Sequence, residues 1–494
     1  MKKIKFLNIL VLFICLMCFV GCDINLDSFM NSGNNQTNQN DNNDNQNGDI
    51  DDNQDNNHQK NTVNFFTMND IHGRLITDSD AGTTAGLDKV STILKELEAK
   101  DEYIKISNGD MFQGSQFSNT LYGRPAIEWM NLEHFDCFVL GNHEFDWGID
   151  KIASYKDGNL ENGELNEDCE ILGCNIYLKS TNAMPSWLQA YSIEECNGYK
   201  VGVIGCIGEG LTSSISASMV ADYVFVDPVP LVKEYAKILR VEEKCDVVIV
   251  SIHDYNTKTQ NSRFASLSGD SRIDAVICGH SHTQNADYLT RSDKYDIPVI
   301  QCRGYNGSVG TINITMNNDA PVSHGKISHY VPANYQSNKE AYDLLFTYYK
   351  DVKDIDTKIG YTTTNLSKET LGMLLCDAIM NKYNAEVGIC NVGGIRSAIG
   401  AGDITYSDIY TVIPFDNTVF IIKIKGSDLK KAINSSLYVN IDNISNAKTY
   451  TVAIISYVYE NYEAFNTKAL EATDTTDIVR DVVAEEIAKR YPAR

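Results

Sequence analysis

The sequence has no excess of basic residues: 42 Lys and Arg stand against 66 Asp and Glu, a formal net charge of −24 over 494 residues. Such a chain lacks the positive field that offsets phosphate repulsion, so we do not expect it to bind a nucleic-acid polymer. A small anionic substrate is not excluded, because bound metal ions reverse the charge of a pocket locally. Pro and Gly are not in excess, and composition and length predict a soluble globular protein of two domains.

The apolar run at the N-terminus is too short for a membrane-spanning helix. Three lysines precede residues 6–20, and about 15 apolar residues fall short of the roughly 20 that a transmembrane helix requires. The pattern ends at Gly21-Cys22 and predicts an export signal over residues 1–22. It resembles a bacterial lipoprotein signal, which implies lipidation of Cys22 and a cell-surface protein that touches the membrane only through this anchor. An ordinary cleaved signal and an uncleaved anchor remain alternatives.

Apolar residues are scarce in the segment that follows the signal. Residues 23–61 consist mainly of Asn, Asp and Gln, and they bury too little surface to offset the entropy of ordering. We therefore predict a disordered tether between the signal and a folded body.

A disulfide framework is also missing from the sequence. Of thirteen cysteines, three lie in the signal segment, and the others are scattered without a regular spacing or a CxxC pair. Several, such as Cys206 and Cys278, stand inside apolar strand-like runs. We expect these to be buried thiols, and no disulfide is assigned.

From residue 61 onward, short apolar runs that end in polar or Gly-containing turns alternate with helical patterns. Runs that are apolar on both faces indicate a sheet covered on both sides, as in layered α/β domains. A helical pattern begins near residue 337 and is followed by a Thr-rich segment. We therefore predict one α/β domain at 62–335, a linker helix at 336–358 and a smaller α/β domain at 359–494.

Five polar segments carry the chemistry, and four of them follow apolar strand-like runs. Each alone is more typical of a solvated turn or a hydrogen-bonded histidine, but together they hold five of the nine histidines. Because ligands bind at the carboxyl ends of strands in open α/β sheets, we expect all five to meet at the same edge of one sheet. The segments are Asn69–Gly73, Asn108–Asp110, Gly141–Asp146, His253 and Gly279–His282.

The spacing within these segments suits a pair of metal ions. Asp70 and His72 are two residues apart, as are His280 and His282, so extended backbone would direct both members of each pair to the same side. Two divalent ions about 3.5–4 Å apart need a bridging carboxylate with imidazole and oxygen ligands, and together they clamp a phosphate. The isolated, loop-borne Asp110 is the natural bridge.

A further histidine lies next to the predicted ligands. His143 is placed to stabilise charge on a phosphoryl or leaving group, and Asp146, three residues on, is within reach to orient its ring.

The series NDIHG, NGDMFQGS, GNHEFD, a single His and GHSH resembles, in order, the calcineurin-like metallophosphoesterases, and more narrowly the 5′-nucleotidase and UDP-sugar hydrolase family. The resemblance implies a four-layer-type sandwich domain followed by a smaller α/β 5′-nucleotidase C-terminal domain. It implies two divalent ions, zinc or manganese, with iron or cobalt as alternatives, and a catalytic pair of His143 and Asp146. One ion would be held by Asp70, His72, Asp110 and His282, and the other by Asp110, Asn142, His253 and His280.

The C-terminal half resembles the substrate-binding domain of the same family. The stretch NVGGIR is similar to its NGGGIR-type loop, and PFDNT is similar to its PFGNT-type segment, whose Phe stacks on the nucleobase. The sequence departs from the family where ISYVYENY replaces a Gly-Gly-Asp-Gly stretch, with an aromatic residue retained. The resemblance implies substrate binding by Asn391, Gly393, Gly394, Arg396, Phe415 and Tyr457.

These features predict an exported enzyme that hydrolyses nucleoside 5′-monophosphates to nucleoside and phosphate. Alternatives within the class are a 2′,3′-cyclic-nucleotide phosphodiesterase or 3′-nucleotidase, a nucleotide-sugar hydrolase and a broad-range phosphatase. A surface binding protein that keeps the fold without the activity is the alternative from another class.

Overall fold

The computed structural model describes the chain from residue 60 onward, with gaps. The predicted signal, its Cys22 and nearly all of the predicted tether lie outside the described part. All described residues belong to one compact unit, His58–Arg494. They are residues 60–77, 85–158, 163–255, 261–317, 320–321, 325–352, 355, 357–441 and 443–494.

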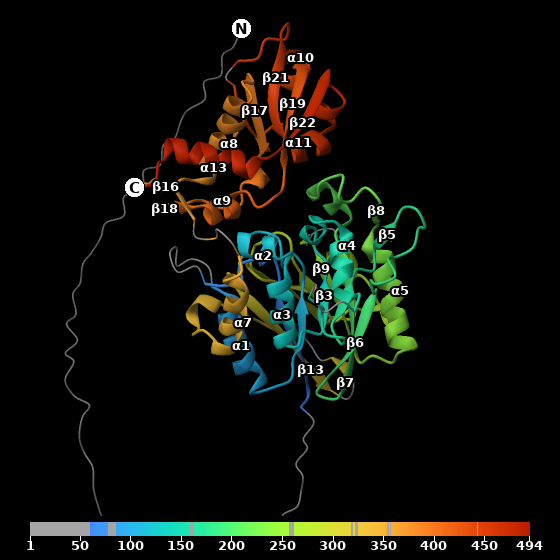
Figure 1. Ribbon diagram of the computed structural model, residues 1–494. Helices are drawn as coiled ribbons and strands as arrows, with labels where there is room; N and C mark the ends of the chain where they lie inside the picture. Colours follow the sequence, from blue (N-terminus) through green and yellow to red (C-terminus); the bar gives the residue numbers. More distant parts are fainter. Residues whose placement is uncertain are drawn as a thin grey trace, which may run out of the picture. The chain divides into compact units, whose positions relative to one another are not determined.

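The first domain contains two mixed sheets (Figure 1). In the first sheet, four parallel strands are flanked by an antiparallel edge, in the order β14-β13-β1-β2-β3-β4, with β15 also paired to β13. Its strands are β1 (Thr62–Met68), β2 (Ile104–Ser107), β3 (Cys137–Val139), β4 (Glu170–Leu172), β13 (Val309–Asn317), β14 (Ala320–Pro321) and β15 (Lys326–Tyr330).

The second sheet has the order β11-β12-β10-β9-β7-β6, with parallel strands in the centre and an antiparallel strand at each edge. Its strands are β6 (Tyr191–Cys196), β7 (Tyr199–Ile207), β9 (Val247–His253), β10 (Ala275–Cys278), β11 (Asn285–Thr290) and β12 (Asp296–Gln301). A separate pair consists of β5 (Ile176–Leu178) and β8 (Tyr223–Phe225).

The strands are apolar on both faces because the two sheets pack against each other. Phe65 and Ile106 of the first sheet share one buried cluster with Val203, Ile249 and Ile277 of the second. The outer face of the first sheet packs against α1 (Leu87–Glu98), α3 (Arg124–Leu132) and α7 (Lys339–Tyr349), and that of the second against α5 (Pro228–Val241). This four-layer order confirms the predicted fold class. Short helices α2 (Gln116–Thr120), α4 (Ile149–Ala153) and α6 (Ser262–Ala265) lie in the connections.

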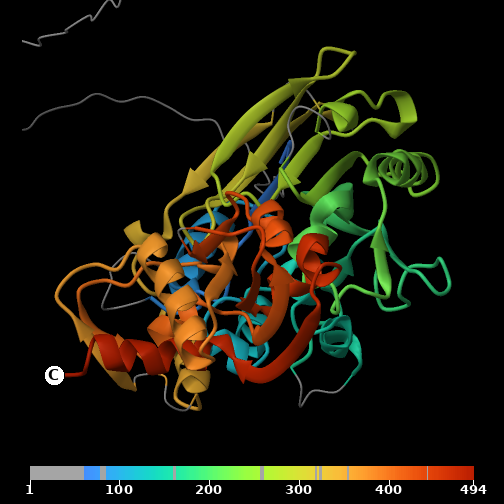
Figure 2. The same cartoon turned by 90° about the horizontal axis from the view of Figure 1, so that it is seen from above.

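The second domain is built on a five-stranded sheet of order β20-β17-β21-β19-β22. In Figure 2, the red C-terminal helix α13 lies beside the orange α8, and these two helices pack on each other. The strands are β17 (Val387–Asn391), β19 (Thr418–Lys425), β20 (Leu437–Asn440), β21 (Thr449–Ile455) and β22 (Glu471–Ile478), with β16 (Lys358–Thr362) and β18 (Gly402–Thr405) as a separate pair. The helices are α8 (Lys368–Lys382), α9 (Tyr406–Val412), α10 (Gly426–Ala432), α11 (Ser456–Asn461), α12 (Glu463–Asn466) and α13 (Val479–Arg490).

Local sequence fixes the start of helix α9, which leads into the segment that contains Phe415. Thr405 Oγ1 accepts the backbone N–H of Asp408, and the Asp408 carboxylate accepts that of Thr405, so both ends of a capping box are present. Such a box satisfies two N–H groups that would otherwise lack partners in the first turn. The helix therefore starts at a defined residue and delivers the chain to Pro414 and Phe415 in a fixed register.

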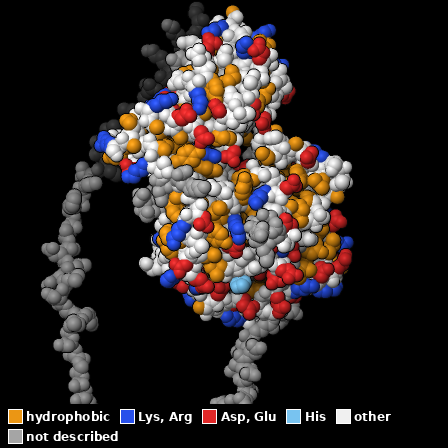
Figure 3. Space-filling model, in the orientation of Figure 1, with side chains coloured by type: hydrophobic (Ala, Val, Ile, Leu, Met, Phe, Trp, Pro, Cys, Tyr) orange, Lys and Arg blue, Asp and Glu red, His pale blue; other side chains and the backbone are white. Residues whose placement is uncertain are grey.

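The ten cysteines of the described residues are all free and buried. This confirms the expectation of buried thiols, including those at Cys206 and Cys278. Within the same part of the chain, no helix combines the length and the apolar character needed to cross a bilayer. On the face drawn in Figure 3, Asp and Glu lie among Lys and Arg, and the described surface there carries no continuous basic field.

A buried charge cluster joins helix α5 to the second sheet. Asp274 is fully buried and pairs with the guanidinium groups of Arg240 and Arg291, which are also buried. Its Oδ2 also accepts the backbone N–H of Val248 at 2.9 Å. Arg240 donates further to the carbonyl oxygens of Arg272 and Asp246. The charges are therefore paired and hydrogen-bonded, as buried ions must be.

Replacing Asp274 by Ala should lower the free energy of unfolding of the first domain by about 3–5 kcal/mol, because the buried guanidinium of Arg240 loses its counter-charge and that of Arg291 keeps only the half-exposed Asp293. Urea denaturation followed by circular dichroism measures the effect. Asp343→Ala is the control, because that carboxylate pairs with Lys339 at the surface of α7 and is 58% exposed; its loss should cost less than about 1 kcal/mol. Equal effects of the two variants would contradict the structural role of Asp274.

Candidate metal centre

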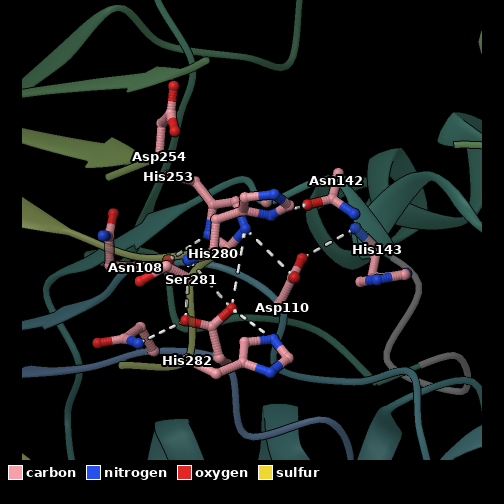
Figure 4. Close-up of polar contacts among 12 residues, drawn as sticks. Asn108, Asp110, Asn142, His143, His253, Asp254, His280, Ser281 and His282 are labelled. Carbon is pink, nitrogen blue, oxygen red and sulfur yellow. Dashed lines mark hydrogen bonds and ion pairs between the residues drawn. The ribbon is translucent and has the colours of Figure 1, made fainter. Parts of the chain in front are cut away.

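Loops that follow strands of both sheets bring the predicted metal ligands together (Figure 4). The prediction that all of them meet at the edge of one sheet is wrong. A strand that is apolar on both faces can be covered by a helix or by another sheet, and its sequence does not show which. The apolar runs therefore did not reveal that they belong to two sheets. Strands β1, β2 and β3 lead to Asp70, His72, Asp110 and Asn142, and β9 and β10 of the other sheet lead to His253, His280 and His282.

The sequence analysis expected extended backbone to direct the two members of each ligand pair to the same side. This expectation is wrong, because the backbone at these residues is left-handed. The φ angles are 54° at Asp70, 52° at His72, 54° at Asp110, 74° at His280 and 57° at His282. Non-glycine residues rarely adopt this left-handed region, and such conformations persist only where the surroundings impose them. Here the loops bind each other: Asp70 N–H donates to the carbonyl of Gly109 at 3.0 Å, and His72 N–H donates to that of Asp110 at 2.9 Å.

The ligand atoms form two groups that share Asp110. In each group, one nitrogen or carboxylate oxygen from every member lies within 4.8 Å of the others. Asp110 Oδ2 lies 3.2 Å from His253 Nε2 and 3.8 Å from His72 Nε2. His282 Nε2 lies 3.4 Å from Asp70 Oδ1. The groups are Asp70, His72, Asp110 and His282, and Asp110, His253 and His280.

Hydrogen bonds to backbone carbonyls fix the rings of two ligands in the cluster. His72 Nδ1 lies 3.1 Å from the carbonyl of Gln113, and His253 Nδ1 lies 2.8 Å from that of Asn108. A carbonyl only accepts, so Nδ1 donates in both rings and Nε2 is turned toward the cluster. Asp110 Oδ2 and His253 Nε2 are buried and have no hydrogen-bond partner among the described residues. Lone pairs that converge without donors fit divalent cations.

Asn142 belongs to the second group by position. Its Oδ1 lies 2.9 Å from His280 Nδ1, and its Nδ2 is buried without a hydrogen-bond partner among the described residues. All seven predicted ligands are thus brought together, and mixed imidazole, carboxylate and amide donors are compatible with zinc, manganese, iron or cobalt.

Burial and mutual charge shift the pKa values of the cluster in opposite directions. Burial lowers the pKa of His282 to about 3, with the charge of Arg396 adding to the effect, and lowers that of His280 to about 4, with the charge of His253 adding. Burial raises the pKa of Asp70 to about 7. At His253, the lowering effect of burial is outweighed by the charges of Asp110 and Asp70 and the hydrogen bonds to Asp110 and Asn108 together, which raise the pKa to about 10. His280 and His282 are therefore neutral at pH 7, the form that binds metal.

The predicted catalytic pair is present beside the cluster. His143 Nδ1 lies 2.7 Å from Asp146 Oδ2, and the backbone N–H of His143 donates to Asp110 Oδ1 at 2.9 Å. Burial lowers the pKa of His143, but the charges of Asp146 and Asp110 and the hydrogen bond to Asp146 together outweigh it, so that the pKa is raised overall. The pair is thus tied to the carboxylate that both ligand groups share.

Glu144 has a role that the sequence did not reveal. Its carboxylate is fully buried and accepts backbone N–H groups from Asp110, Met111 and Gly141 at 2.8–2.9 Å. It therefore holds the loop after β2 against the loop after β3. In the sequence it stood between two assigned residues, and nothing indicated that its partners would be backbone amides.

The second domain places Arg396 at the metal centre. Its Nη2 lies 3.3 Å from His72 Nε2, and its Nη1 donates to the carbonyl of Gly393 at 3.4 Å. Asn391 Oδ1 is buried without a hydrogen-bond partner among the described residues. Gly394 packs against Asn391, and a Cβ there would lie 2.6 Å from Asn391 Oδ1. The predicted loop therefore faces the ligand cluster.

The two predicted stacking residues also face the first domain. The ring of Phe415 stacks on that of His143, with centroids 5.5 Å apart, and the hydroxyl of Tyr457 donates to the carbonyl of Ser213 at 2.9 Å. Arg480 fixes the Phe415 segment, because its Nη1 donates to the carbonyls of Ile413 and Phe415. The sequence analysis did not identify Arg480, which lies 65 residues away from Phe415.

A cavity of about 420 Å³ connects these groups. Besides the predicted residues, it is bordered by side chains to which the sequence analysis gave no role, several of them within the motifs that it quoted. These are Gln113, Trp147, Ser214, Ser216, Ser218, Met219, Pro414, Asp416, Asn417, Thr418, Ser456, Glu460 and Asp474.

Comparison with known proteins agrees with this architecture. Endonuclease YhcR of Bacillus subtilis is 25% identical over 404 residues, which are 75% of this chain but only 32% of that protein. Snake venom 5′-nucleotidase of Crotalus adamanteus is 26% identical over 421 residues, 75% of this chain and 69% of that protein. The crystal structure of a 5′-nucleotidase precursor from Thermus thermophilus has the same fold, with a TM-score of 0.75 and 18% identity, over 87% of this chain and 97% of that chain.

Two family models match the chain in the order of its domains. Residues 63–284 match the calcineurin-like phosphoesterases, and residues 351–441 match the 5′-nucleotidase C-terminal domain. Both matches confirm the family predicted from the motif series. The chain therefore carries a calcineurin-like phosphoesterase domain followed by a 5′-nucleotidase C-terminal domain.

Proposed function

We propose that the protein is a two-metal phosphoesterase that hydrolyses nucleoside 5′-monophosphates to nucleoside and phosphate. The observation that carries this proposal is the approach of Arg396 to within 3.3 Å of His72 in the metal centre. A guanidinium group suits phosphate, and it stands here beside residues that fit two divalent cations. The same cavity holds the rings of Phe415 and Tyr457, which suit a nucleobase. The name of the snake venom relative supports a nucleotide substrate.

The reaction transfers the phosphoryl group to water. Two divalent cations, when bound, would activate the water and stabilise charge on the attacking and leaving oxygens. The water oxygen forms a bond to phosphorus, the bond between phosphorus and the 5′ oxygen breaks, and the leaving oxygen takes up a proton. Arg396 holds the phosphate through paired N–H groups during this exchange.

His143 acts next to the reacting group. Its Nδ1 is fixed by Asp146 at 2.7 Å, which sets the ring orientation and leaves Nε2 available to the phosphoryl or leaving oxygen. Phe415 stacks on the same ring and excludes water from one of its faces. The backbone bond from His143 to Asp110 keeps the ring in register with the shared ligand.

The same centre would also serve the alternatives within the class. A 2′,3′-cyclic-nucleotide phosphodiesterase or 3′-nucleotidase, a nucleotide-sugar hydrolase and a broad-range phosphatase need the same metal ligands and differ in how the cavity holds the rest of the substrate. A surface binding protein would keep the fold and release no phosphate.

Phosphate release from a substrate panel tests the proposal. The panel contains adenosine 5′- and 3′-monophosphate, a 2′,3′-cyclic nucleotide, a nucleotide sugar and an aryl phosphate, each with Mn²⁺ or Zn²⁺ and after chelation. We expect the highest kcat/KM for the 5′-nucleotide, loss of activity on chelation and its return with metal. His143→Ala should lower kcat by about 10²–10⁴-fold. Equal rates across the panel would favour the broad-range phosphatase, and no release with any metal would contradict an enzymatic role.

Arg396→Ala should lower kcat/KM for the preferred nucleotide by about 10- to 100-fold, because charge-assisted hydrogen bonds to phosphate are lost. Arg396→Lys should recover part of this loss, since it keeps the charge without the planar fork. Steady-state kinetics together with the metal content of each variant separate substrate binding from metal loss. Arg263→Ala, which removes a half-exposed ion pair with Asp227, is the control. Unchanged kinetics of Arg396→Ala would exclude the assigned role.

We also propose that the protein is exported and held at the cell surface by a lipid on Cys22. The support is the N-terminal sequence, with its three lysines, apolar run and Gly21-Cys22. Cys22→Ala should abolish incorporation of labelled fatty acid and move the protein from the membrane fraction to the medium. Labelling that persists in this variant would rule out lipidation at this residue.

A further inference from the structure

Helix α11 of the second domain is bonded to a serine-rich loop of the first domain, residues 213–218. The side-chain amide of Asn461 makes two hydrogen bonds with this loop. Its Nδ2 donates to the carbonyl of Ile215 at 2.7 Å, and its Oδ1 accepts the N–H of Ala217 at 3.1 Å. The hydroxyl of Tyr457 donates to the carbonyl of Ser213. Three residues of one short helix are therefore aligned by this loop, and the third is Glu460.

Hydrogen bonds orient the carboxylate of Glu460 through only one of its two oxygens. Its Oε2 accepts the hydroxyls of Ser216 at 2.8 Å and Ser218 at 3.2 Å. Its Oε1 accepts no hydrogen bond from any described residue, and no Lys or Arg side chain among them pairs with it. Glu460 borders the cavity together with the two serines. The loop thus presents one open acceptor to whatever occupies the cavity.

Glu460 lies next to a predicted stacking ring. Tyr457 and Glu460 are three residues apart in α11, so they share a face of the helix. A base packed against Tyr457 would therefore lie in the part of the cavity that Glu460 borders, where a hydrogen bond from the base edge can reach the carboxylate. An ionised carboxylate accepts hydrogen bonds and donates none, so it attracts N–H groups and repels ring nitrogens that carry lone pairs.

The other charged groups of this cavity point to the same preference. Asp416 is paired with Arg480 at 2.7 Å and is thereby neutralised. Asp474 is exposed, and its Oδ1 accepts the N–H of Thr476. Among the described residues that border the cavity, Arg396 is the one Lys or Arg, and it faces the metal centre. The part of the cavity around α11 therefore offers acceptors and negative charge.

We propose that Glu460, held by Ser216 and Ser218, determines base specificity by accepting N–H groups from the base edge, and that it favours guanine. Guanine presents a ring N–H and an amino group side by side. Hypoxanthine has the ring N–H without the amino group, and adenine places a lone pair beside its amino group. This inference rests on the proposed nucleotidase function, and it names the substrate that the enzyme prefers.

The test compares kcat/KM for guanosine, inosine and adenosine 5′-monophosphates, each divided by the value for an aryl phosphate with the same enzyme. In the wild type, the guanine nucleotide should exceed the other two by about tenfold or more, since hydrogen bonds to a charged group discriminate by that amount. Glu460→Gln should reduce this preference to within about threefold, because the amide offers an N–H as well as an acceptor. Glu463→Gln, an exposed residue that follows α11 and does not border the cavity, is the matched control and should keep the wild-type ratios.

A second measurement uses only the wild-type enzyme, so it tests the base preference even if Glu460→Gln does not fold. Guanosine should inhibit the wild-type enzyme, assayed with the aryl phosphate, at least about tenfold more strongly than inosine, which lacks only the amino group. Nucleotide hydrolysis with equal rates for the three bases, or ratios that Glu460→Gln leaves unchanged, would overturn the specificity inference and leave the proposed function standing. Failure to release phosphate from any nucleotide while the aryl phosphate is cleaved would overturn both.

Discussion

The buried carboxylate of Asp110 is the group on which the rest of the site depends. Its Oδ2 faces His253 and His72, and its Oδ1 accepts the N–H of His143, so both ligand groups and the catalytic pair meet at one residue. The close fit requires glycine beside it: a Cβ at Gly109, where φ is +82°, would lie 2.6 Å from His253 Nδ1. A buried carboxylate is costly unless it is paired, and cations beside Oδ2 would add to the pairing that the histidines give.

The second constraint is that neither sheet holds a complete site. The first sheet supplies the carboxylates and the second supplies three imidazoles, so the ligand groups form only where the sheets pack face to face. Arg396 then enters from another domain and reaches His72. Apolar packing aligns the strands, the loops present the ligands, and the second domain adds a guanidinium group beside them.

The sequence predicted the ligands because each metal-binding segment is short and directly follows an apolar run. Asp70 and His72, or His280 and His282, are recognisable without knowing the fold. Their left-handed backbone was not predictable, because it is imposed by hydrogen bonds to other loops. The four-layer sandwich followed from the resemblance, whereas the strand patterns alone did not show that the ligands come from two sheets, since such patterns show burial and not what covers a strand. Contacts such as Ser216 to Glu460, 244 residues apart, leave no local trace in a sequence.

A chain of net charge −24 suits a phosphate substrate only if charge is arranged locally. At one end of the cavity, Arg396 and two ligand groups that fit cations make the site attractive to an anion. The acidic residues around α11 have different partners. Asp416 forms an ion pair with Arg480, whereas Glu460 accepts hydrogen bonds from two hydroxyls at one oxygen and has no partner at the other among the described residues. Neutral hydroxyls orient a carboxylate without cancelling its charge. The cavity therefore holds one region for an anion and another for hydrogen-bond donors, which matches a molecule with a phosphate at one end and a base at the other.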